Sequence, residues 1–265
     1  MARFLLSSVL ALTIASPALA VEKADVIETY ANIAEATYGD SLLTAQRLQG
    51  AVDALIAQPS PANLDLARKA WRAARIPYQQ SEVFRFGNPI VDDWEGGLNS
   101  WPLDEGLIDY VDASYGGASD ENAFAELNVI ANPVFNLSGT QVDATNITPN
   151  LIRETLHEAD GNEANVASGY HAIEFLLWGQ DLNGTKSGSG ARSWTDYAQG
   201  EACTNQNCDR RGDYLKAATD LLVTDLEYMV AQWGTQGAAR TNLFANEDAA
   251  ISAMLTGMGS LSYGE

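Results

Sequence analysis

The stretch ADVIETYANIAEATYGDSLLTAQRLQGAVDALIA, residues 24–57, decides the fold class. Apolar residues recur in it every three or four positions, from Ile27 to Leu55. That spacing is typical of an amphipathic α-helix, so it predicts one long helix or two helices broken near Gly39. The same periodicity continues through most of the chain, and we see no convincing run with the period of two that marks strands.

The other elements follow from similar signals. Ser60 and Pro61 form an N-cap followed by proline at the first helical position, which predicts the start of a second helix. Pro77 should kink this helix because proline removes a backbone donor. Further helices are expected near 123–131, 149–158, 165–178 and 209–233, and from Asn246 onward. Residues 87–106, GNPIVDDWEGGLNSWPLDEG, are predicted to form a long loop, and loops of that length are often functional.

The composition limits the function. The chain has 265 residues, with 35 acidic and 15 basic side chains and a formal net charge of −20. Such a surface repels phosphate backbones and anionic lipids, which argues against nucleic acid as a partner, whereas it suits hard cations. Two histidines and two cysteines are too few for poly-histidine or multi-cysteine zinc sites or cysteine-bound iron–sulfur clusters.

The first residues are typical of an export signal. Arg3 provides a positive charge, residues 4–15 are apolar, and 18–20 form an Ala-x-Ala cleavage site. We therefore expect residues 1–20 to be a signal peptide and the mature protein to be periplasmic or associated with the outer membrane or cell surface.

A flexible loop with a local disulfide is predicted over 183–208. It contains the glycine- and serine-rich stretch GTKSGSGAR and the pair Cys203 and Cys208. In an exported protein these cysteines are expected to form a disulfide that pins the start of the following helix, since two thiolates alone do not fill a metal's coordination sphere. A helical pattern begins at Asn246, and the chain then stops at residues 262–265 without a polar tail. This ending suggests a truncated product.

The sharpest chemical feature is GYHAIEFLLWGQD, residues 169–181. In a helix, His171 and Glu174 lie three apart on one face and can bind one cation together. The alternative is a histidine that hydrogen-bonds its own helical neighbour. Gly169 lets another backbone or a ligand come close. The other histidine, His157, is expected at a helix end, where an imidazolium meets the negative end of the dipole.

Carboxylates elsewhere must complete a metal site built on one histidine. Glu82 is one candidate, although an ion pair with Arg85 would explain it equally well. Asp104 and Glu105 are further candidates, although Asp104 also suits a helix N-cap. A mixed site of this kind favours iron, manganese, calcium or zinc.

Several segments together resemble one known family. The motif Gly-x-His-x-x-Glu at 169–174, with RIPYQQSEVFRFG at 75–87, LNSWPLDEGLIDYV at 98–111 and CTNQNCDRRGDYL at 203–215, resembles the imelysin family, also called peptidase family M75, and its iron-regulated branch. The resemblance covers nearly all of residues 25–265. It implies an all-α fold of two bundle-like halves within a domain at 21–265. Because family members continue further, the second half would be incomplete and the C-terminal part of the family fold missing.

The resemblance also implies a function. His171 and Glu174 would be metal ligands, with Glu82 and Asp104 completing the site, and no residue is assigned a catalytic role. The expected cofactor is iron, or another divalent cation, bound as the ion or as a metal complex during iron acquisition, with iron-uptake membrane components as partners. The alternative is a metallopeptidase in which the same pair holds a cation that activates water. A third interpretation is an interaction domain whose motif is structural.

Overall fold

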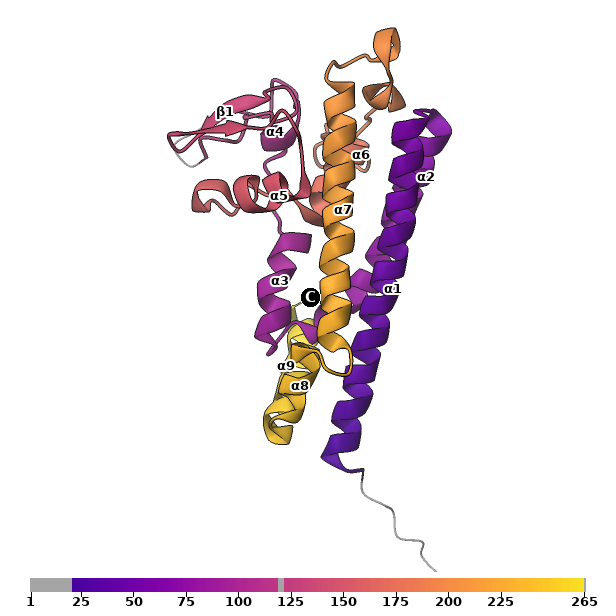
Figure 1. Ribbon diagram of the computed structural model, residues 1–265, viewed down its shortest axis with the longest axis vertical. Helices are drawn as coiled ribbons and strands as arrows, with labels where there is room; N and C mark the ends of the chain where they lie inside the picture. Colours follow the sequence, from indigo (N-terminus) through magenta and orange to yellow (C-terminus); the bar gives the residue numbers. More distant parts are fainter. Residues whose placement is uncertain (1–20, 119–121, 265) are drawn as a thin grey trace, which may run out of the picture.

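The computed structural model describes residues 21–118 and 122–264, so the predicted signal peptide lies outside the described residues. The helices, drawn in Figure 1, are α1 (Lys23–Ala57), α2 (Pro61–Gln80), α3 (Pro89–Asn99), α4 (Glu105–Ile108), α5 (Pro149–Leu151), α6 (Gly169–Trp178), α7 (Cys208–Trp233), α8 (Ala238–Phe244) and α9 (Glu247–Gly264). Short turns η1 (Glu82–Phe84), η2 (Ile152–Leu156), η3 (Ala159–Gly161), η4 (Trp194–Tyr197) and η5 (Gly200–Ala202) connect them. The prediction of an all-α fold is confirmed.

Helix α1 runs along the long axis of the molecule and packs along α2 and α7 (Figure 1). It is one continuous helix of 35 residues, so the chain does not break at Gly39. Its buried positions follow the predicted helical spacing: Ile27, Ala31, Ala34, Tyr38, Ser41, Ala45, Leu48, Val52 and Leu55. Helix α2 begins as predicted, because the Ser60 hydroxyl accepts a hydrogen bond from the Asn63 N–H at 3.2 Å, and it continues past Pro77 to Gln80.

The buried residues form two clusters along this axis. The larger lies between the C-terminal half of α1, α2, α6 and α7. The smaller contains the N-terminal half of α1, the end of α7, and residues of α3, α8 and α9. Several aromatic rings meet in the smaller cluster, where Tyr38 stacks on Trp233 with ring centroids 6.2 Å apart. Burying large rings in offset contact stabilises this end of the bundle.

The predicted loop at 87–106 is wrong over most of its length, because α3 occupies Pro89–Asn99. Pro89 stands at the start of the helix, where the missing N–H costs nothing, and Val91 and Leu98 lie seven residues apart on its buried face. The glycines and prolines of this stretch indicated a loop, but Pro89 instead marks the start of a helix.

The predicted helix at 123–131 is also wrong. Here the backbone N–H groups of Val129 and Ile130 donate to the carbonyls of Leu107 and Ile108, so this segment pairs with α4 and forms isolated turns instead of a continuous helix. The structure also contains one short hairpin that the sequence did not predict, in which β1 (Val134–Leu137) pairs antiparallel with β2 (Thr140–Asp143).

The helix predicted at 149–158 is shorter than expected, being the single turn of α5 followed by the π turn η2.

The start of α6 is set by a close backbone contact. A side chain added at Gly169 would place its Cβ 2.3 Å from the Leu98 carbonyl oxygen of α3, and Gly169 has a positive φ of +78°. Both conditions require glycine. The expectation that Gly169 admits another backbone is confirmed, and the contact locks α6 against α3.

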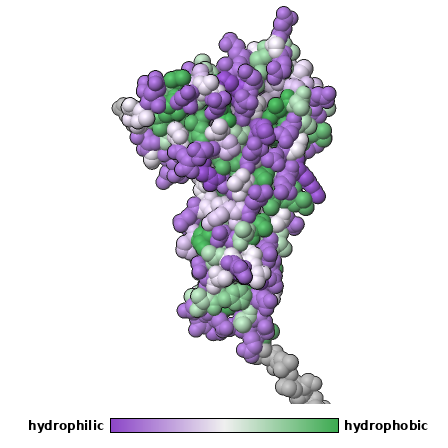
Figure 2. Space-filling model, in the orientation of Figure 1, coloured by the Kyte–Doolittle hydropathy of each residue, from purple (hydrophilic) through white to green (hydrophobic). Residues whose placement is uncertain are grey.

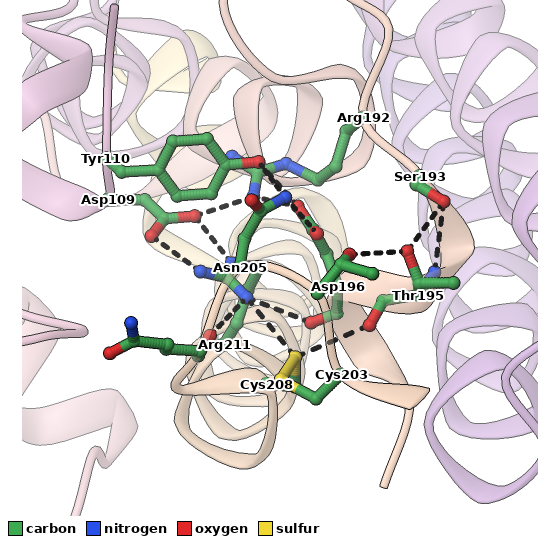
Figure 3. Close-up of a disulfide and its surroundings, with 12 residues drawn as sticks. Asp109, Tyr110, Arg192, Ser193, Thr195, Asp196, Cys203, Asn205, Cys208 and Arg211 are labelled. Atoms are coloured by element: carbon green, nitrogen blue, oxygen red, sulfur yellow. Dashed lines mark hydrogen bonds and ion pairs between the residues drawn. A yellow bond between two sulfur atoms is a disulfide. The ribbon is translucent and has the colours of Figure 1, made fainter. Parts of the chain in front are cut away.

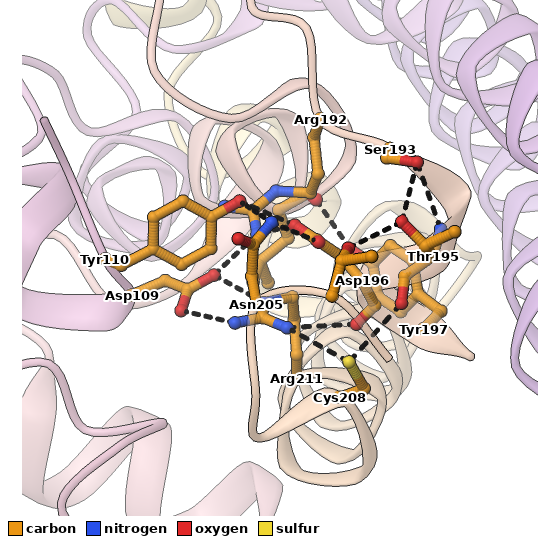
Figure 4. A network of polar contacts seen from close by, with 12 residues as sticks. Asp109, Tyr110, Arg192, Ser193, Thr195, Asp196, Tyr197, Asn205, Cys208 and Arg211 are labelled. Carbon is orange, nitrogen blue, oxygen red and sulfur yellow. Dashed lines mark hydrogen bonds and ion pairs between the residues drawn. The ribbon is translucent and has the colours of Figure 1, made fainter. Parts of the chain in front are cut away.

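A buried ion network holds the segment before α7 (Figures 3 and 4). Asp109 accepts hydrogen bonds from Arg192 at 2.6 Å and from Arg211 at 2.6 and 3.0 Å, and Asp196 accepts a second bond from Arg192 at 3.1 Å. Burial alone raises the pKa of Asp109, but the two guanidinium groups outweigh burial and hold that pKa below its usual value. Asp109 is therefore ionised at neutral pH.

A disulfide lies in the same segment before α7. Cys203 and Cys208 form a disulfide with an S–S distance of 1.98 Å, and Cys208 is the first residue of α7 (Figure 3). The segment that composition marks as flexible thus carries side chains that are completely buried, such as Arg192 and Asp196.

Hydrophilic residues cover most of the molecular face in Figure 2, and hydrophobic ones appear as separate spots. No helix in the described ranges is both long and apolar enough to cross a bilayer.

Replacing Gly169 by alanine is expected to lower the free energy of unfolding by about 3 kcal/mol or more, because the new Cβ meets the Leu98 backbone and the positive φ is strained. Urea unfolding followed by circular dichroism would measure the change. Gly39→Ala is the control: it lies inside α1 with nothing within 4 Å of an added Cβ, and should raise stability by about 1 kcal/mol. Equal stability of the two variants would contradict the packing role of Gly169.

Asp109→Asn is expected to lower the free energy of unfolding by about 3–5 kcal/mol, because it leaves two buried guanidinium groups without their shared carboxylate. Asp112→Asn, three residues along and fully exposed, should remain close to wild type. Thermal unfolding of both variants at neutral pH provides the comparison. A shift for Asp109→Asn no larger than that for Asp112→Asn would show that the network is not essential.

Candidate functional site

Helix α6 buries nearly all of its surface. It packs against α2, α3 and α7, and of its ten residues all except His171 and Glu174 are buried. A helix that is apolar around most of its circumference belongs in a protein interior. His171 and Glu174, three residues apart, are therefore the side chains of α6 that are more than marginally exposed.

His171 and Glu174 lie side by side as predicted. The Nδ1 atom of His171 is 3.1 Å from Oε2 of Glu174, and the side chains are 22% and 42% exposed, respectively. When Nδ1 carries the proton, it donates to the carboxylate and Nε2 keeps its lone pair, which is the arrangement found in metal-binding histidines. Two adjacent donors bound to one ion at about 2.1 Å each lie about 3 Å apart. The distance between Nδ1 of His171 and Oε2 of Glu174 is close to this value.

Both side chains line a pocket of about 500 Å³. Two further acids, Glu105 and Asp181, line it with them. Its other lining residues are apolar, cationic or small: Trp71, Arg72, Trp101, Leu103, Phe175, Trp178, Gly179, Gly188, Ser189 and Gly190. The pocket thus combines one imidazole and three carboxyl groups with tryptophan walls.

Glu105 is the pocket acid whose ionisation is most perturbed. Burial raises its pKa to about 7, the carboxylates of Asp181 and Glu174 add to this effect, and the charge of Arg192 opposes it. At neutral pH this carboxyl group is therefore partly protonated. A cation that entered the pocket would favour its charged form.

The structure does not bring Glu82 and Asp104 to this pocket. Glu82 lies in η1 and forms an ion pair with Arg85 at 2.8 Å. The Asp104 side chain accepts hydrogen bonds from Asn122 and, at 3.3 Å, from Tyr115, and it lines a different pocket. Although Asp104 precedes α4, its side chain forms no capping hydrogen bond there.

His157 lies at a helix end, as expected, but its ring is neutral there and is not an imidazolium. It follows the π turn η2, and its Nδ1 atom accepts a hydrogen bond from the Ala167 N–H at 3.3 Å. Burial lowers its pKa. A neutral His157 thus supports the segment that leads into α6, where Ser168 in turn donates to the Gly97 carbonyl at 2.8 Å.

Two pocket residues were not singled out from the sequence. Asp181 lies two residues after Gly179, the C-cap glycine of α6, and ends the stretch 169–181 that contains the motif, so its position was an available signal. Arg72 lies on α2, and its guanidinium carbon is 5.1 Å from the ring centroid of Trp178. Within the described residues, no three His, Cys, Asp or Glu side chains are grouped closely enough to hold a metal ion.

Comparisons with known proteins agree on one family. The family model of imelysin, peptidase M75, matches residues 34–265. Over 60 residues the chain is 38% identical to the iron-regulated protein A of Synechococcus elongatus, a match that covers 23% of this chain and 17% of that protein. A crystal structure described as an iron-regulated protein A precursor from Parabacteroides distasonis has a TM-score of 0.57 and 24% identity, over 91% of this chain and 58% of that one.

The chain spans less than two thirds of the length of either protein. The structural likeness supports the helical fold, and the family model covers most of the sequence, including the Gly-x-His-x-x-Glu motif and the pocket around it. This chain therefore belongs to the imelysin family.

Proposed function

We propose that this protein is exported and binds iron, as the ion or as a complex, during iron acquisition. The observation that carries the proposal is the 3.1 Å pair of His171 and Glu174, presented by an otherwise buried helix to a pocket with two more acids. The iron-regulated names of the relatives and the excess of acidic residues support it. Export is supported by the signal-like pattern at 1–20, and iron-uptake membrane components would be its partners.

In this proposal His171 supplies a nitrogen donor and Glu174 either joins it or fixes its tautomer. Glu105 and Asp181 hold negative charge around the cargo. Glu82 and Asp104 would have to leave their partners, Arg85 and Asn122, before they could join. Their role as ligands therefore depends on the family resemblance alone.

A peptidase activity is the second candidate. It is favoured by the family name and by Glu105, since a carboxyl group whose pKa is about 7 can serve as a general base at neutral pH. The pocket would then need a cation held by His171 and Glu174 to polarise the peptide carbonyl. Cleavage of an unfolded substrate, lost in both variants of that pair, would favour this candidate over binding alone.

We expect wild-type protein to bind Fe²⁺ under anaerobic conditions and to unfold at a higher temperature when iron is present. His171→Ala and Glu174→Gln should each weaken binding by about ten- to a hundredfold, because each removes a donor or the group that orients it. Equilibrium dialysis with elemental analysis would give the affinities.

Glu201→Gln is the matched control, because it removes one exposed negative charge outside the pocket. It should bind iron like the wild type. If all four proteins bound iron equally, or if none bound it, the proposed function would be wrong.

The affinity for Mn²⁺, a redox-stable probe, should rise with pH up to about 7. Below that pH Glu105 is protonated, so a bound cation must expel its proton, at a cost of up to about tenfold in affinity per pH unit. Above about pH 7 this contribution levels off. Calorimetric titrations between pH 5.5 and 8 would show a flatter profile for Glu105→Gln. An identical pH profile for the variant would exclude Glu105 from the cation's surroundings.

A further inference from the structure

The pocket is far larger than a single ion. Its volume is about 500 Å³, whereas one water molecule occupies about 30 Å³ in the liquid. Pockets of about 300–1,000 Å³ are typical of small-molecule sites. The volume therefore leaves room for more than a bare ion.

The protein also supplies too few donors for a bare ion. His171 and Glu174 provide two, and no group of three His, Cys, Asp or Glu side chains close enough for one metal exists within 21–118 and 122–264. Two donors leave most of an octahedral sphere open. A chelator that keeps its own oxygens on the metal would fill the remaining positions.

The wall of the pocket carries a cation as well as acids. Arg72 lies on the face of Trp178, with its guanidinium carbon 5.1 Å from the ring centroid. A guanidinium group repels a metal ion but pairs with carboxylate oxygens, often through two parallel hydrogen bonds. A ligand that satisfies both kinds of charged group in the pocket lining must therefore present a metal toward His171 and a carboxylate toward Arg72.

Tryptophan rings complete the walls. Trp71 and Trp178 contact each other edge to face with ring centroids 5.3 Å apart, and the Trp71 N–H donates to the Tyr170 carbonyl at 2.9 Å. Trp101, by contrast, is 74% exposed although it lines the same pocket. An exposed ring over a pocket offers apolar surface to the body of a ligand.

We infer that the cargo of this pocket is an iron chelate with free carboxylate arms, held by His171 and Glu174 at the metal and by Arg72 at a carboxylate. The inference rests on the proposed function and specifies its ligand. It also explains why the protein's own donors stop at two.

Ferric citrate with separately labelled iron and citrate is the probe. Equilibrium dialysis against wild-type protein should retain both labels in a fixed ratio. Arg72→Gln should weaken retention of the chelate by about tenfold or more, since a hydrogen bond between charged groups is lost. It should bind Fe²⁺ without chelator at least as tightly as the wild type, since a charge that repels the bare ion is removed. Trp101→Ala should also weaken retention of the chelate, and because this ring is 74% exposed its removal leaves the buried core intact.

Lys69→Gln is the control for Arg72, because it removes a positive charge from the same helix at a residue paired with Asp65. It should bind the chelate like the wild type. Three results would overturn the inference: retention of iron without citrate, failure to retain the chelate, or equal chelate affinity in Arg72→Gln. The proposed function would still stand in each case if Fe²⁺ binding depended on His171. Absence of iron binding in every form would reject the proposed function itself.

Discussion

The rest of the site depends on the ion pairs that the buried carboxylate of Asp109 forms with two arginines. Asp109 lies at the C-terminal end of α4 and binds Arg211 of α7 and Arg192 of the preceding segment. Burying these charges is costly unless each is paired, so the network tolerates few other arrangements. Figure 4 shows how the side chains converge from separate elements.

The network reaches the pocket through the backbone of Arg192. The N–H of this residue donates to the Trp178 carbonyl at 2.8 Å, and its own carbonyl accepts a hydrogen bond from Arg68 of α2 at 2.8 Å. These bonds fix the end of α6 and the glycine-rich stretch at 188–190 that forms one wall of the pocket. The side-chain charge of Arg192 also lowers the pKa of Glu105, against the effect of burial. One residue therefore serves both the packing and the electrostatics of the site.

Helical periodicity was sufficient to predict α1, α2 and α7, because each buries a regular stripe along its length. It failed for α3, where Pro89 and two glycines resembled loop residues, and at 123–131, where pairing with α4 overrides local preference. The motif located His171 and Glu174, since their spacing is local to one helix. The resemblance assigned Asp104 to the site, whereas Glu105 lines the pocket, because the packing of α4 decides which of these neighbouring side chains faces it.

The pocket's mixed charge constrains how a cargo can be held. Three acids and an imidazole attract a metal, yet among these four groups only His171 and Glu174 are in direct contact, and Arg72, which also lines the pocket, disfavours a bare cation. A site that supplied every donor would bind tightly and release slowly, because affinity differences arise mainly in dissociation rates. A site that contributes two donors leaves the remaining bonds to the cargo's own ligand. Under the proposed function, such a site can exchange its metal with a downstream acceptor.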